Sequence, residues 1–200
     1  MHNRTPLIRA AFSAATTLLL MTGCHPAMST QSDSSSADHA EPSMFPLRFY
    51  NHGFAVHCYN TIRCQVIYYD HDFTRLLGDK PSGPPPSPDY REKWSMAMRS
   101  WIPNFPPPAE VRWTSLDGTE HEAKVDIGAI FKDQRVLYRV PDAEIPDRSW
   151  GDDPSIFLEI SDRTLNVYMK AFIATKSEQT PGNKDSDYRA DVIRAWTHTY

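Results

Sequence analysis

Asp70, His71 and Asp72 are consecutive residues whose types could support acid–base catalysis. Carboxylates on both sides of an imidazole favour its charged form. The group could therefore act as a general acid and base, with a carboxylate that orients the histidine. Adjacent residues on one strand or turn point in different directions, however, and a polar turn closing the preceding strand is the simpler interpretation. A hydrolase of unfamiliar type would need these three side chains to converge with a further polar group in a cleft.

The segment from Leu20 to Cys24 carries a different chemistry, because it resembles the lipobox of bacterial lipoproteins. Two arginines and an apolar run precede it, in the order of an export signal, and the run is too short to span a bilayer. The resemblance implies cleavage before Cys24 and acylation of that residue, which would anchor the protein stably. An ordinary signal peptide is the alternative. Residue His25, in place of Asp, favours the outer membrane by the sorting rule of such lipoproteins, with the domain facing the periplasm.

Apart from Cys24, the chain has two cysteines, Cys58 and Cys64. The cell envelope permits disulfides, and pairing would close a short hairpin-like loop worth about 2 kcal/mol on the chain-entropy estimate. A zinc site formed with His57 and His71 is the alternative, but the spacing matches no common ligand pattern. We therefore predict a disulfide and no metal.

The sequence contains none of the familiar catalytic signatures. It has no Gly-x-Ser-x-Gly elbow, no phosphate-binding glycine loop and no calcium loop. His121-Glu122 begins like a zinc-protease helix, yet Val125 stands where the second histidine is required, and the neighbouring alternation indicates a strand. We expect no enzyme activity, no cofactor and no small-molecule substrate.

The charge balance bears on the class of partner. The whole chain has a formal charge of −4, and loss of residues 1–23, which contain two arginines and no acid, makes the mature protein more acidic. Nucleic acids and anionic membranes attract clustered lysines and arginines, which this composition does not favour. We expect no nucleic-acid binding, membrane association through the N-terminal lipid only, and a basic surface on any charge-steered protein partner.

Composition divides the chain into three parts. Residues 1–23 form the predicted signal peptide, and residues 24–44 are rich in Ser and polar residues with almost nothing apolar, so they are predicted to be a disordered tether. Residues 45–200 are enough for one hydrophobic core and too few for two. We predict a single globular domain there.

Alternating and β-branched runs predict that this domain is mainly β. Asp117-Gly118 and Asp162-Arg163 lie between pairs of such runs and predict two hairpins. Helical spacing of Val192, Ile193 and Trp196 predicts a short C-terminal helix over 187–197. Residues 89–101 fit either a short helix or a buried strand. The expected strands are 47–50, 65–69, 111–115, 120–127, 135–140, 156–160 and 165–173. The fold class is therefore a β-sandwich of six or seven strands with an α addition.

Stiff loops indicate recognition, because the chain has seventeen prolines against eight glycines and stiffness lowers the entropic cost of presenting a surface. Tryptophans beside proline-rich loops can anchor an interface, although packing in the core or within the loops is the more common reason for such residues. Acidic residues near the third tryptophan could match a basic partner, or could simply be solvated. The candidate partner-binding residues are Trp94, Trp101, Trp150, Asp147, Asp152 and Asp153.

Three blocks carry a family resemblance: 49–52, 111–122 and 156–169. They resemble small proteobacterial lipoproteins encoded beside type VI secretion phospholipase effectors and regarded as their immunity proteins, over roughly 45–200. The resemblance implies a periplasm-facing protein that binds a cognate lipase effector and blocks it, with 81–108 and 141–154 as the expected interface. The alternative is a structural or assembly lipoprotein of the cell envelope or secretion apparatus that neutralises no toxin.

Overall fold

The computed structural model describes residues 43–95, 97–147 and 153–200. The predictions for the signal peptide, for Cys24 and for nearly all of the tether lie outside these ranges. Both large sheets and the hydrophobic core lie within them. A fragment that begins at Ser43 therefore contains every core residue that the structure describes. No helix among the described residues is long and apolar enough to cross a membrane.

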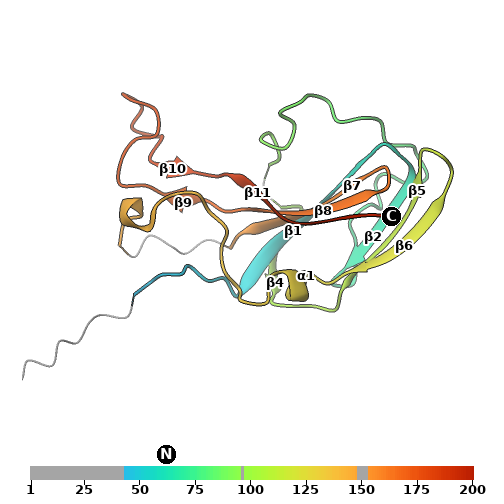
Figure 1. The fold of residues 1–200 in the computed structure, drawn as a ribbon, viewed down its shortest axis with the longest axis horizontal. Coiled ribbons are helices and arrows are strands. Elements are labelled where there is room, and N and C mark those ends of the chain that lie inside the picture. Colours follow the sequence, from blue (N-terminus) through green and yellow to red (C-terminus); the bar gives the residue numbers. More distant parts are fainter. Residues whose placement is uncertain (1–42, 96, 148–152) are drawn as a thin grey trace, which may run out of the picture. The chain divides into compact units, whose positions relative to one another are not determined.

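Two sheets pack face to face around one core (Figure 1). The larger sheet has the order β11-β8-β7-β1-β4, and the smaller has the order β3-β2-β5-β6. The strands of the larger sheet are β1 (Asn51–Tyr59), β4 (Arg99–Pro103), β7 (Ser155–Ser161), β8 (Thr164–Lys170) and β11 (Val192–Thr199). Those of the smaller sheet are β2 (Thr61–Tyr68), β3 (His71–Asp72), β5 (Ala109–Ser115) and β6 (Glu120–Val125). The predicted mainly β class is confirmed.

Four short elements complete the part of the fold that the structure describes. The strands β9 (Ile173–Ala174) and β10 (Tyr188–Arg189) pair with each other. Helix α1 (Ile127–Ile130) is capped by the side chain of Asp126, and a 3-10 turn follows at Asp142–Glu144. The expected strand at 135–140 is wrong, because only Arg135 forms a β-bridge there, to Arg48. The expected strand at 47–50 is likewise reduced to this bridge, since the first long strand, β1, begins at Asn51.

The two predicted hairpins are confirmed. Strands β5 and β6 turn at Asp117-Gly118, where Gly118 has φ 85°, a conformation that suits glycine. Strands β7 and β8 turn at Asp162-Arg163. Strand β7 also runs parallel to β1, from Gly53 opposite Ser155 onward.

The predicted C-terminal helix is wrong, because that segment is the edge strand β11, paired with β8. A β-bulge between Arg194 and Trp196 shifts the register, so that Ile193 lies opposite Met169 and Trp196 opposite Val167. Both β8 residues belong to the core. The bulge therefore places residues three apart on one face of a strand, which imitates helical spacing.

The larger sheet is buried on both faces. Its inner face packs on the smaller sheet, and its outer face is covered by residues 87–94, which we call the strap. Tyr90 and Trp94 of the strap form a second apolar cluster with Ala55, Phe157 and Tyr168. Burial on both faces explains why six consecutive residues of β7 are buried rather than every second one.

Cys58 and Cys64 form the predicted disulfide. It joins β1 of the larger sheet to β2 of the smaller sheet, beside the turn at Asn60. Because both sulfurs are bonded to each other, the alternative zinc site is wrong. Among the described residues, no group of three or more His, Cys, Asp or Glu side chains could hold a metal ion.

Candidate protein-recognition surface

The edge strand β4 presents Trp101 to solvent. Its side chain is 77 % exposed, whereas the next residue, Ile102, is completely buried. Trp101 has φ 62°, in the left-handed region that a large aromatic residue rarely adopts. The pairing of β4 with β1 is irregular between His52 and Phe54. Such irregularities re-aim side chains, and here the indole is directed away from the core.

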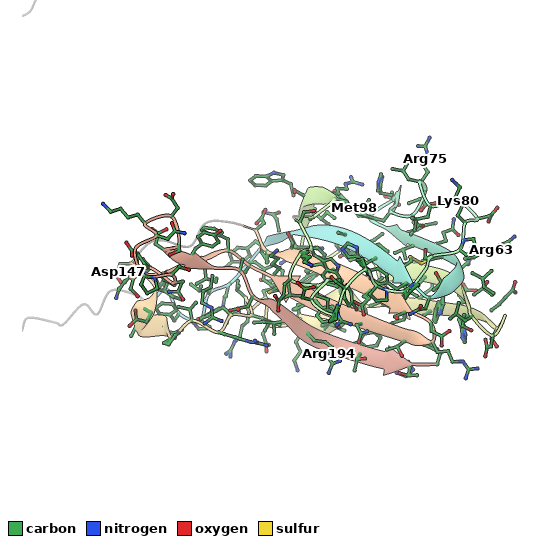
Figure 2. The ribbon with its side chains drawn as sticks, turned by 90° about the horizontal axis from the view of Figure 1, so that it is seen from above. Arg63, Arg75, Lys80, Met98, Asp147 and Arg194 are labelled. Carbon is green, nitrogen blue, oxygen red and sulfur yellow. A yellow bond between two sulfur atoms is a disulfide. The ribbon has the colours of Figure 1, made fainter. Side chains whose placement is uncertain are left out.

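Neighbouring residues extend the exposed apolar area around this strand. Met98, just before β4, is 59 % exposed and projects from the surface in Figure 2. Arg99 lies with its guanidinium 4.7 Å from the ring centroid of Tyr69 and donates a hydrogen bond of 3.1 Å to the Tyr69 carbonyl. This cation–π contact and hydrogen bond hold the start of β4 against the turn that follows β2.

A hollow of about 350 Å³ adjoins the end of β4. Its walls include proline and aromatic side chains, which are stiff and largely apolar. The lining residues are Ile67, Tyr68, Tyr69, Asp70, Pro103, Asn104, Phe105, Pro106, Pro107, Pro108 and Glu110. We call Met98, Arg99, Trp101 and this hollow the β4 surface.

A buried histidine fixes the segment that follows β4. The Asn104 amide donates to the Phe49 carbonyl at 2.9 Å, so its side-chain oxygen faces His52 and accepts from Nδ1 at 2.8 Å. The other ring nitrogen of His52 then accepts from the Tyr68 hydroxyl at 3.0 Å. Burial lowers the pKa of His52 and raises that of Tyr68, so both stay neutral. This satisfied network makes the wall of the hollow rigid.

Trp94 does not contribute to this surface, and its prediction as a partner-binding residue is wrong. It is 5 % exposed and stacks on His57, with ring centroids 4.4 Å apart, and on Phe157 at 5.0 Å. The physical reason is the second buried face of the larger sheet, which takes up the aromatic residues of the strap. Sequence reasoning could have found it from the continuous apolar run at 156–158.

The remaining predicted partner-binding residues precede β7 in the sequence. Trp150 and Asp152 lie outside the described residues. Asp147 is exposed, and Figure 2 places it at the end of the domain away from Met98. Asp153 is partly exposed and precedes β7. Asp147 and the β4 surface therefore do not form one patch.

The Asp70-His71-Asp72 group does not converge. Asp70 and His71 are exposed, and Asp72 accepts hydrogen bonds from the backbone and hydroxyl of Thr74, at 2.9 Å and 2.7 Å. Partial desolvation raises the pKa of Asp72, but the hydrogen bonds from Thr74 and Gln65 outweigh it and hold that pKa below its usual value. These residues form the polar turn expected as the simpler interpretation.

Sequence reasoning missed a buried carboxylate. Glu159 is fully buried, and Arg91 binds it through two hydrogen bonds of 2.9 Å. The Tyr90 hydroxyl and the Asn166 amide donate to it at 2.9 Å and 3.1 Å. The bonds from Tyr90 and Arg91 tie the strap to β7, and the bond from Asn166 joins β8 to β7, so the group is structural. A single acid inside the apolar run 156–160 was the available signal.

Comparisons with protein-family models, with curated proteins and with solved structures find no match for this chain.

Proposed function

We propose that this protein is a lipid-anchored periplasmic immunity protein whose β4 surface binds and inhibits a type VI secretion phospholipase effector. The observation that carries the recognition part of this proposal is the exposed, left-handed Trp101 on an edge strand. The nature of the partner and the anchor at Cys24 rest on the resemblance and lipobox described above.

The energetic argument starts from the cost of presenting this tryptophan. A bulky residue in the left-handed region costs about 1–3 kcal/mol, and such conformations concentrate at functional sites. An indole in water also lacks the favourable free energy that its burial would provide. Tryptophans that are exposed in a free protein and fill a pocket in a complex are frequent interface hot spots. A binding role accounts for both costs.

The surroundings of Trp101 suit a tight inhibitor. The cation–π contact of Arg99, the proline wall and the His52 network all restrict motion before any partner arrives. A pre-organised surface loses little entropy on binding, which a protein that must occlude an active-site entrance requires. The projecting indole and the adjoining hollow offer a partner both a convex and a concave feature.

The test uses the fragment 43–200 as bait for the product of the adjacent open reading frame and for a cell lysate. We expect a stoichiometric complex with a lipase that loses activity on binding. Trp101→Gly should weaken this complex about thirtyfold or more, the range of an interface hot spot, while the fragment stays folded because glycine adopts positive φ freely.

Phe172→Ala is the matched control, since Phe172 is a 45 % exposed aromatic residue outside the β4 surface. It should leave lipase binding unchanged. Capture of envelope or secretion components alone, with no lipase inhibited, would reject the immunity proposal in favour of a structural or assembly lipoprotein. Equal binding by the Trp101→Gly fragment and the unchanged fragment would move the interface away from β4.

A further inference from the structure

The turn at 73–80, which follows β3, holds two leucines in solvent. Leu76 is 92 % exposed, the highest value for a large apolar side chain among the described residues, and Leu77 is 38 % exposed. Neither the β4 surface nor the proposed inhibition uses them. Transfer of both side chains from water into an apolar environment outside the protein would be favourable.

The base of this turn is rigid. Phe73 is buried with its ring centroid 4.9 Å from that of Phe54. The hydroxyl of Thr74, also buried, accepts from the backbone of Val66 at 3.0 Å and donates to Asp72 at 2.7 Å. The Leu77 amide donates to the Thr74 carbonyl at 2.8 Å. The turn therefore cannot fold its leucines back onto the domain without breaking these contacts.

Cations surround the leucines. Arg75 and Lys80 are exposed, and neither forms a salt bridge with any residue that the structure describes. Arg63 reaches the turn from β2, 3.6 Å from Asp79, and lines one hollow together with Arg75 and Asp79. Figure 2 shows Arg63, Arg75 and Lys80 pointing outward at the same end of the domain. Within the turn itself, two cations, Arg75 and Lys80, stand against one acid, Asp79, whereas Asp72, Glu120 and Glu122 line the same hollow as Arg63 and Arg75.

We propose that this turn binds the surface of an anionic phospholipid bilayer. Leu76 and Leu77 enter the boundary between headgroups and acyl chains, while Arg75, Lys80 and Arg63 face lipid phosphates. Basic residues beside exposed apolar ones are the combination that holds a protein in the membrane interface. The turn would act in addition to an anchor at Cys24 and independently of any effector.

The small size of the patch favours lipid over a protein partner. A stable protein interface buries about 800 Å² on each side with complementary packing, which two leucines on a convex turn do not supply. Insertion into a bilayer requires no complementary pocket, and its free energy grows with each buried apolar group and each cation near the surface. The two cations of the turn, Arg75 and Lys80, complement phosphates, which every patch of an anionic bilayer provides.

Sedimentation of the fragment 43–200 with lipid vesicles tests the proposal, because the fragment contains every core residue that the structure describes and lacks Cys24. The vesicles are phosphatidylethanolamine alone or mixed with phosphatidylglycerol. We expect binding to the phosphatidylglycerol vesicles that decreases with added salt. The double variants Leu76→Ser/Leu77→Ser and Arg75→Gln/Lys80→Gln should each weaken it about tenfold or more.

Leu116→Ser is the matched control, since Leu116 is a 60 % exposed leucine on the β5–β6 turn, beside the acid Asp117. It should bind vesicles as the unchanged fragment does, and circular dichroism should show all variants folded. Failure of the fragment to bind, or equal binding by the Leu76→Ser/Leu77→Ser variant, overturns the proposal. Loss of lipase binding by that variant without any vesicle binding assigns the turn to a protein partner instead. The vesicle assay contains no effector, so its outcome is separate from that of the pulldown.

Discussion

At the scale of single residues, two histidines show how burial decides the chemistry of an imidazole. Both His52 and His57 lie in β1 on opposite faces of the larger sheet, and burial lowers the pKa of both. His52 has a partner on each ring nitrogen. The Nε2 atom of His57 is buried and has no hydrogen-bond partner among the residues that the structure describes. Protonation of His57 therefore has no compensating contact at that atom, and His57 should govern part of the response to acid.

We predict that stability falls as the pH drops below 6.5. Burial lowers the pKa of His57 from 6.5 to about 4, although the charge of Glu159 acts in the opposite direction. Between these values the unfolded chain binds more protons than the folded one, so the free energy of unfolding is complete above pH 6.5 and decreases toward pH 4, by up to about 3 kcal/mol. Urea unfolding at a series of pH values measures this slope.

His57→Phe is the informative variant, because phenylalanine keeps the stack on Trp94 and cannot titrate. It should flatten the slope between pH 6.5 and 4 and leave the contribution of His52. An unchanged slope in this variant would show that His57 does not control the acid response.

At the scale of elements, the strap consists of turns rather than a helix or strand and is fastened by one buried carboxylate. Glu159 receives hydrogen bonds from two strap residues, Tyr90 and Arg91. Lys170 adds a further contact, since its ammonium donates to the Trp94 carbonyl at 2.6 Å. The strap covers an apolar face without forming a strand there, so these contacts take the place of a hydrogen-bonded ladder.

We predict that Glu159→Gln loosens the strap. The neutral amide has one acceptor oxygen and cannot form the ion pair or both hydrogen bonds with Arg91, and breaking a buried ion pair costs several kcal/mol, but the Arg91 side chain is 37 % exposed. The loss should therefore be smaller, about 2 kcal/mol in the free energy of unfolding, with faster hydrogen exchange at 87–94. Glu122→Gln is the control, because the Glu122–Arg112 pair is exposed, and it should change stability by less than about 0.5 kcal/mol. Equal effects of the two substitutions would contradict a fastening role for Glu159.

At the scale of the whole molecule, a disulfide joins the two sheets. Cys58 and Cys64 lie in β1 and β2, which belong to different sheets. We predict that the variant Cys58→Ser/Cys64→Ser stays folded and loses about 2 kcal/mol, the chain-entropy value for so short a loop. Reducing agent should lower the urea midpoint of the unchanged protein to that of the variant and leave the variant unaffected. A midpoint insensitive to reduction would show that the covalent link is not needed to hold the sheets together.

The sequence predicted local features of the molecule well. Asp117-Gly118 and Asp162-Arg163 carry their turn preferences within a few residues, so both hairpins could be predicted. The pairing of the cysteines followed from their number. In each case the physical cause lies close by in the chain, where single-sequence reasoning has access to it.

Features that depend on distant contacts could not be predicted. The bulge at Arg194 depends on β8, and without it the spacing of Ile193 and Trp196 reads as helical. The burial of Trp94 depends on β1, β7 and β8. Within the β4 surface, the sequence indicated the candidate Trp101 but neither its backbone conformation nor the adjoining hollow.

The parallel pairing of β1 with β7 has a consequence for how the chain reaches its destination. These strands lie side by side in the larger sheet, yet Gly53 meets Ser155 only after most of the domain has been synthesised. Contacts this distant in the chain form slowly, because a long loop must close before they contribute. A chain that is exported as proposed would therefore lack its central strand pair while ribosomes are still extending it. For an exported chain, this delay would keep the polypeptide unfolded enough to pass through a translocation channel, and its folding would be completed after export.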